Sequence, residues 1–124
     1  TIVATGIMVK KSLDAAEKLA SEGIDVTVID PRTLSPLDMS TTFESVESTG
    51  RLMVVQEGAS HGGFINEVIA QVAGSHVFGS LKAPIKKVAG LNIPIPYAPQ
   101  LEKAAVPQVE DIHAAASELV KSWR

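Results

Sequence analysis

The stretch that decides the fold is residues 51–73, RLMVVQEGASHGGFINEVIAQVA. Its four apolar residues 52–55 are typical of a strand that is covered on both faces. Gln56 and Glu57 are expected to end this strand, and the glycines of residues 58–63 are expected to reverse the chain. Apolar residues then recur at helical spacing, which predicts an amphipathic helix that starts at the glycine pair. They are Ile65, Val68, Ile69 and Val72.

Outward from this stretch, strands and helices are expected to alternate along the chain. The expected strands are residues 1–5, 24–30, 52–55 and 84–89. The expected helices are residues 8–21, 36–49 and 63–73, and a last one from about residue 109 that includes Trp123. Ser35 would cap the second helix, with Pro36 at its first position. Asp14 and Lys18 have the spacing of a surface ion pair on the first helix. Residues 91–107 contain four prolines, which predict a polyproline-like surface arm with little regular structure.

This alternation predicts an α/β fold, a mainly parallel sheet with helices on both faces in three α/β/α layers. Right-handed crossovers with one reversal of direction give the strand order 2-1-3-4. The reversal falls between the first and third strands. Ligands usually bind at the carboxyl ends of strands beside such a reversal. The candidate crevice or interface residues are therefore Gly6, Glu57, His61, Gly62 and Gly63.

The chemistry of this cluster has more than one interpretation. His61 beside Glu57 resembles an acid–base pair or half of a metal site, but no third ligand follows at a suitable spacing. The simpler interpretation is that His61 is a solvated loop histidine and not a metal ligand. A role of this cluster in an interface stays open. Gly62 and Gly63 precede a helix, where phosphate can bind, but neither common glycine-rich phosphate motif is present. The residues by themselves predict no self-sufficient catalytic or metal site.

Composition limits the remaining classes of function. The 124 residues suit one domain, residues 1–124, and the net charge of −3 gives no support for a nucleic-acid partner. The absence of cysteine excludes disulfides and thiolate chemistry and fits a cytosolic protein. No apolar run approaches the roughly 18 residues of a membrane helix, so no membrane partner is expected. Thr1 lies inside the first expected strand, which suggests a fragment of a longer protein.

Three motifs resemble one family. TIVATGIMV at residues 1–9 and AAEKLASEGIDVTVIDPRTLSPLD at residues 15–38 resemble the opening of the transketolase C-terminal domain. Transketolases, deoxyxylulose-phosphate synthases and 2-oxo acid dehydrogenases share that signature. The segment APIKKVAGLNIPIPYAPQLEKAAVPQVEDI at residues 83–112 is similar to a narrower group. This group is the β subunit of the thiamine-dependent decarboxylase of pyruvate, branched-chain 2-oxo acid or acetoin dehydrogenase complexes.

The resemblance implies an assembly role more than a catalytic one. In this family, thiamine diphosphate and Mg²⁺ lie between two other domains, which carry a GDG…N metal motif and an activating glutamate. Neither segment is present here, so the cofactors are expected in the full enzyme and none is expected on this fragment. The C-terminal domain contacts the α subunit and a second β subunit in a heterotetramer. It also helps to dock the dihydrolipoyl acyltransferase. An antiparallel edge strand that normally lies beside residues 24–30 is expected to be missing.

One residue departs from the family pattern. Relatives commonly carry an acidic residue directly before the pair Ala83-Pro84, where it meets a basic side chain of the acyltransferase. This chain has Lys82 there, which is expected to weaken that contact. A second candidate docking surface lies around Tyr97 and Leu101 on the proline-rich arm.

The expected function is therefore that of an assembly and partner-docking domain in a thiamine diphosphate-dependent 2-oxo acid dehydrogenase, an oxidoreductase. The isolated domain is expected to be inactive. The expected compartment is the cytoplasm of a bacterium or archaeon, with the mitochondrial matrix as the other candidate. The alternative is a regulatory domain that binds a small molecule in the crevice at Gly6, Glu57 and His61.

Overall fold

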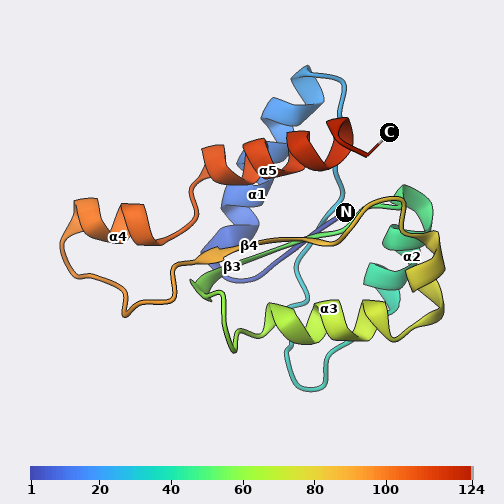
Figure 1. The fold of residues 1–124 in the computed structure, drawn as a ribbon, viewed down its shortest axis with the longest axis horizontal. Coiled ribbons are helices and arrows are strands. Elements are labelled where there is room, and N and C mark those ends of the chain that lie inside the picture. Colours follow the sequence, from blue (N-terminus) through green and yellow to red (C-terminus); the bar gives the residue numbers. More distant parts are fainter. Residues whose placement is uncertain (124) are drawn as a thin grey trace.

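The computed structural model describes residues 1–123 and contains one four-stranded sheet (Figure 1). The strands are β1 (Ile2–Ala4), β2 (Val28–Ile29), β3 (Met53–Ala59) and β4 (Lys86–Gly90). The helices are α1 (Ile7–Ser21), α2 (Ser40–Thr49), α3 (Ile65–Ala73), the 3₁₀ helix η1 (His76–Ser80), α4 (Pro99–Ala105) and α5 (Val109–Lys121). All pairings are parallel and the order is β2-β1-β3-β4, which confirms the predicted topology.

Helices cover both faces of the sheet, which confirms the three-layer architecture. In Figure 1, α1 and α5 lie on one side of the strands, and α2 and α3 lie on the other. Successive strand residues face opposite sides. Met53 accordingly packs in the core under α1 and α5, whereas Val54 packs in the core above α2 and α3. No helix among residues 1–123 is long and apolar enough to cross a membrane.

Strand β3 is longer than predicted. It continues through Gln56 and Glu57 to Ala59, because β4 still pairs with it at Ala59 and Gly90 after an irregularity in the register. Strand β2 is shorter than the predicted residues 24–30. Only Val28 and Ile29 are assigned to it, since the three-residue strand β1 offers little more backbone to pair with.

The predicted start of the second helix was wrong. Helix α2 begins at Ser40, four residues later than expected, and Ser35 and Pro36 precede it in the loop. Asp38 organises that start instead, because its carboxylate accepts hydrogen bonds from the backbone N and the Oγ of Ser40 at 2.8 and 2.7 Å.

The predicted ion pair between Asp14 and Lys18 was also wrong. Asp14 pairs with Lys10 at 3.0 Å, whereas Lys18 reaches across to Glu110 of α5 at 3.4 Å. The helical spacing permitted either partner for Asp14, and the packing of α5 beside α1 gives Lys18 a different carboxylate.

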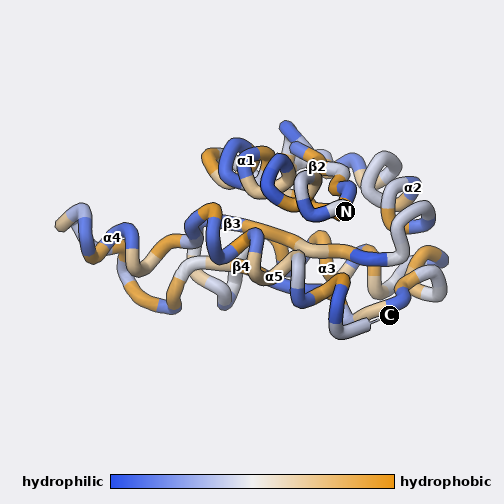
Figure 2. The backbone as a smooth tube through the Cα atoms, turned by 90° about the horizontal axis from the view of Figure 1, so that it is seen from above, coloured by the Kyte–Doolittle hydropathy of each residue, from blue (hydrophilic) through white to orange (hydrophobic). Residues whose placement is uncertain are grey.

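The proline-rich arm was predicted to lack regular structure, yet its second half forms α4. Pro99 is tolerated there because it occupies the first turn, where a backbone N–H has no partner within the helix. Residues 91–98 remain irregular. Figures 1 and 2 both show α4 projecting beyond the body of the molecule. Trp123 follows the end of α5 and is half exposed, so it does not extend the apolar face of that helix.

Candidate functional site

Glu57 and the start of α1 lie on the same groove, at the carboxyl ends of the central strands. The groove has a volume of about 610 Å³. Its lining residues are Ile7, Lys11, Glu57, Pro99, Glu102, Lys103, Val106 and Gln108. Lys11 is already engaged there, because its Nζ donates to the carbonyl of Pro107 at 2.9 Å. The groove therefore offers mainly the carboxylates of Glu57 and Glu102 and the ammonium of Lys103.

His61 has different neighbours from Glu57. Its backbone N–H donates to the Asn92 side chain at 2.8 Å, and its own side chain is exposed. Within residues 1–123, no hydrogen bond or ion pair joins His61 to Glu57, and no three acidic, histidine or cysteine side chains form a metal-binding group. The structure therefore gives no geometry for the acid–base pair considered above.

Gln56, which was predicted only to end a strand, organises the glycine loop. It is 5% exposed, and its Nε2 donates to the carbonyls of Gly58 and Ala59 at 3.3 and 2.7 Å. Its Oε1 accepts the backbone N–H of Ile65 at 3.2 Å. A Cβ added to Gly63 would lie 1.8 Å from Nε2, so Gly63 leaves the room that this side chain fills. The sequence signal for this role was the position of Gln56, a polar residue directly between a buried apolar run and a glycine loop.

The glycine pair does not fit a diphosphate group. Anions bind a helix N-terminus through backbone N–H groups that are free to donate. At the start of α3, the N–H of Ile65 is bonded to Gln56, and that of Asn66 to the carbonyl of Gly63 at 3.1 Å. Gly62, with a φ of 68°, serves to turn the loop. The residues present at this loop therefore do not fit the diphosphate of thiamine diphosphate.

Lys82 is held against the end of α2. Its backbone N–H donates to the carbonyl of Gly50 at 2.8 Å, and a Cβ added to Gly50 would lie 2.8 Å from Cδ of Lys82. A cation is favoured beside the carbonyl end of a helix. An apolar hollow of about 470 Å³ adjoins this position. It is lined by Phe78, Gly79, Leu81, Ala83, Pro84 and Ile85. Lys82 is thus packed against Gly50 at the end of α2 and lies beside an open apolar hollow.

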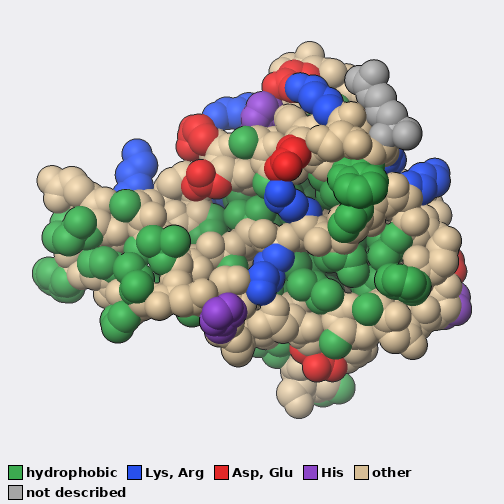
Figure 3. All heavy atoms as spheres, in the orientation of Figure 1, with side chains coloured by type: hydrophobic (Ala, Val, Ile, Leu, Met, Phe, Trp, Pro, Cys, Tyr) green, Lys and Arg blue, Asp and Glu red, His purple; other side chains and the backbone are tan. Residues whose placement is uncertain are grey.

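The arm, residues 91–107, carries the largest concentration of exposed apolar side chains among the described residues. Tyr97 is 99% exposed and Leu101 is 59% exposed, and Leu91, Ile93 and Ile95 are each about half exposed. Figure 3 shows hydrophobic side chains gathered over this projecting segment. Contiguous exposed apolar surface of this kind marks interaction sites in soluble proteins.

Comparison with known proteins gives a consistent result. Residues 1–112 match the family described as Transketolase, C-terminal domain. The chain is 46% identical over its full 124 residues to acetoin:2,6-dichlorophenolindophenol oxidoreductase subunit beta of Cupriavidus necator, covering 36% of that protein. It is also 46% identical over 116 residues to pyruvate dehydrogenase E1 component subunit beta-1, mitochondrial, of Arabidopsis thaliana. That match covers 94% of the chain and 32% of the plant protein.

A solved structure shares the fold. The chain superposes with a TM-score of 0.80 and 28% identity on a protein described as "Split gene transketolase, inactive beta4 tetramer". The match covers 99% of the chain and 38% of that protein. The chain thus spans about a third of the length of the relatives that it matches.

Proposed function

Because the chain belongs to the transketolase C-terminal domain family, we propose that residues 1–124 form the C-terminal domain of the β subunit of a thiamine diphosphate-dependent 2-oxo acid dehydrogenase. The observation that carries this proposal is the 46% identity to an acetoin oxidoreductase β subunit over every residue of the chain. The whole enzyme would be an oxidoreductase that decarboxylates a 2-oxo acid and transfers the acyl group to lipoamide.

The role of this domain is assembly and docking. Two features support this: the glycine loop is filled by Gln56, and the arm exposes apolar side chains that have no role in the core. Thiamine diphosphate and Mg²⁺ belong to the other domains of the full enzyme. The partners are an α subunit, a second β subunit and the dihydrolipoyl acyltransferase. The compartment is the bacterial or archaeal cytoplasm or the mitochondrial matrix.

Each of the two exposed surfaces is assigned to a different partner. The arm, with Tyr97 and Leu101, contacts a partner subunit, because burying apolar surface is the main driving force for stable association. The surface around Lys82, which has an apolar hollow beside a charge, contacts the acyltransferase. A charged residue beside an apolar surface contributes mainly to orientation and choice of partner.

Binding to the subunits of an acetoin dehydrogenase complex tests this proposal. The α subunit and a full-length β subunit are immobilised separately, and the chain is passed over each. Binding to at least one is expected, and the double substitution Tyr97→Asp with Leu101→Asp should abolish it. Leu13→Asp is the matched control, because Leu13 is a similarly exposed leucine on α1, at 51%. Absence of binding to both subunits, or equal losses in the arm and control variants, contradicts the proposal.

A regulatory domain that binds a small molecule is the second candidate. The observation that favours it is the groove of about 610 Å³ beside Glu57. Calorimetric titration with nucleotides and phosphorylated metabolites tests it, with Glu57→Ala as the site variant. Saturable binding that the Glu57 variant changes and the arm variants leave unchanged favours the regulatory role.

A further inference from the structure

The arm leaves the body at the end of β4 and returns at the start of α5. Its two ends are joined at the base, because the backbone N–H of Leu91 donates to the carbonyl of Ala105 at 3.0 Å. A Cβ added to Gly90 would lie 3.3 Å from that carbonyl, so Gly90 leaves room for this close approach. Between the two ends, α4 projects from the body in Figures 1 and 2. One hydrogen bond closes the base but does not set the direction of the arm.

Packing within the chain does not hold α4 in place. Every residue of α4 except Ala105 is exposed. The helix has only seven residues, and isolated helices shorter than about 12 residues are marginally stable in water. The last carbonyls of a helix also have no partner inside it. The position of α4 therefore depends on the groups that bind its final carbonyls.

Gln108 binds the end of α4. Its side-chain Nε2 donates to the carbonyls of Lys103 and Val106 at 3.1 and 2.8 Å. Its backbone N–H donates to the carboxylate of Asp111 at 2.8 Å, in the first turn of α5. Gln108 thus joins the last turn of α4 to the first turn of α5.

Lys11 of α1 ties this junction to the body. Its Nζ donates to the carbonyl of Pro107 at 2.9 Å and to Oε1 of Gln108 at 3.3 Å. Hydrogen bonds from an ionised donor are stronger than those between neutral groups. Lys11 and Gln108 are both half-buried, so water competes less for these bonds than it would on an exposed surface. The junction between α4 and α5 is therefore held at a defined place against α1.

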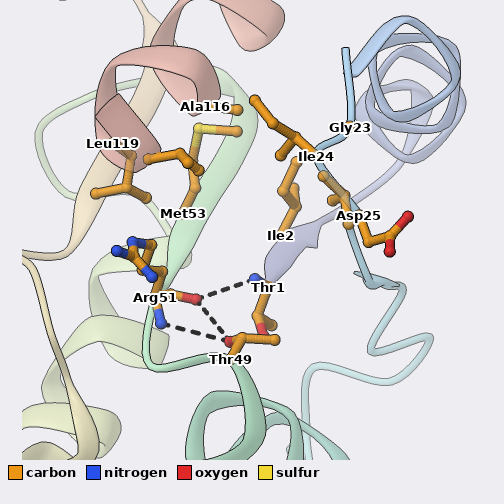
Figure 4. A pocket seen from close by; sticks show the side chains of 12 residues that line it. Thr1, Ile2, Gly23, Ile24, Asp25, Thr49, Arg51, Met53, Ala116 and Leu119 are labelled. Carbon is orange, nitrogen blue, oxygen red and sulfur yellow. Dashed lines mark hydrogen bonds between the residues drawn. The ribbon is translucent and has the colours of Figure 1, made fainter. Parts of the chain in front are cut away.

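The two helices that receive this junction are fixed to the core. In Figure 4, Ala116 and Leu119 of α5 lie beside Met53 of β3, and all three belong to one cluster of buried side chains. Helix α1 contributes buried side chains to the same cluster. The segment after α5 is also held, because the side chain of Arg51 donates to the carbonyl of Trp123 at 2.6 Å. Helices α1 and α5 therefore form a rigid support for the arm.

We propose that Lys11 and Gln108 form a latch that sets the direction of the arm, and that they are positioning residues for the contact between the arm and its partner. The direction of the arm follows from the hydrogen bonds of the latch. The effect on a partner rests on the proposed docking role of the arm. A released arm must be ordered when it binds, and this loss of conformational freedom lowers the affinity.

A distance measurement between the arm and the body tests the latch. The chain has no cysteine, so Glu17→Cys on α1 and Gln100→Cys on α4 place two nitroxide labels at exposed positions. Pulsed electron paramagnetic resonance should give one narrow distance distribution for the labelled chain. Gln108→Ala and Lys11→Met should each broaden it. Lys11→Arg should keep it narrow, because it retains a charged donor.

Two control variants remove the same side-chain groups elsewhere. Gln71→Ala removes a glutamine that donates to Glu67 on α3 at 2.9 Å, and Lys10→Met removes the neighbouring lysine, which pairs with Asp14 at 3.0 Å. Both should leave the distribution narrow. The inference is overturned if the latch variants match these controls, or if the labelled chain is already as broad as the latch variants. Lys11→Met decides the question even if Gln108→Ala fails to fold.

Binding to the immobilised α and β subunits tests the positioning role. Lys11→Met should weaken binding about threefold or more relative to Lys10→Met, because the released arm must be ordered. Equal binding of the two lysine variants overturns the positioning role if the Tyr97 and Leu101 double variant still loses binding. Absence of binding by the unaltered chain contradicts the proposed function instead, and the distance measurement then decides the latch by itself.

Discussion

The body of this molecule and its arm use apolar residues in opposite ways. In the body, Leu52 and Val54 are fully buried between the sheet and its helices. In the arm, the side chains of Tyr97 and Leu101 are also largely apolar, yet Tyr97 is 99% exposed and Leu101 is 59% exposed. Apolar residues of the body stabilise the fold through the surface that they remove from water. Those of the arm do not, so their contribution must come from association with another molecule or be absent.

The strongest test compares one residue from each region. Leu52→Ala should lower the free energy of unfolding by about 2–5 kcal/mol, because it removes a fully buried side chain and leaves a cavity. Tyr97→Ala should change it by less than about 0.5 kcal/mol, because Tyr97 is 99% exposed. Urea unfolding of both variants measures the difference. Similar losses in the two variants would show that the arm is part of the folding core.

A second test concerns the glycine loop of the body. Gly63→Ala should lower the free energy of unfolding by about 1–3 kcal/mol, because the new Cβ displaces Gln56 from its buried hydrogen bonds. Gly79→Ala is the control, since a Cβ there meets nothing within 4 Å and should change stability by less than about 1 kcal/mol. Thermal unfolding, with urea unfolding at one temperature, gives both values. A stable Gly63 variant would mean that the loop tolerates another position of Gln56.

The smallest expected effect concerns Lys82 on the body. Lys82→Glu should strengthen binding to the basic subunit-binding domain of an acyltransferase by about 1 kcal/mol at low salt, because it replaces repulsion by attraction. The gain should shrink as salt rises, since screening acts over roughly 10 Å at moderate ionic strength. Affinities of both forms at two salt concentrations decide this. Equal affinities at low salt would move the proposed acyltransferase contact to the arm around Tyr97.

Most of the architecture could be predicted because it follows from hydrophobic periodicity. The strand order and the covering helices depend on apolar runs such as residues 52–55, whose burial leaves few alternatives. The exact ends of the helices and strands depended instead on contacts of individual residues. Helix α4 was missed because Pro99 was read as a helix breaker, although it is tolerated in a first turn. Strand β3 was predicted to be too short because its end depends on pairing with β4 and not on its own residues.

The site was less predictable than the fold. The position of Glu57 on the groove could be predicted because the topology places the end of β3 beside the start of α1, whereas its functional role stays a prediction. Gln56 was missed because its role depends on three backbone groups that come together only after the loop has folded.

The segment that follows α5 is tied back to the centre of the molecule. Arg51, which lies just before β3, donates through its side chain to the carbonyl of Trp123 at 2.6 Å. This contact joins residues that are 72 positions apart in the sequence, so it closes the second half of the chain into one large loop. Contacts of such large sequence separation slow folding, because the entropy of loop closure is lost before the contact can stabilise the structure.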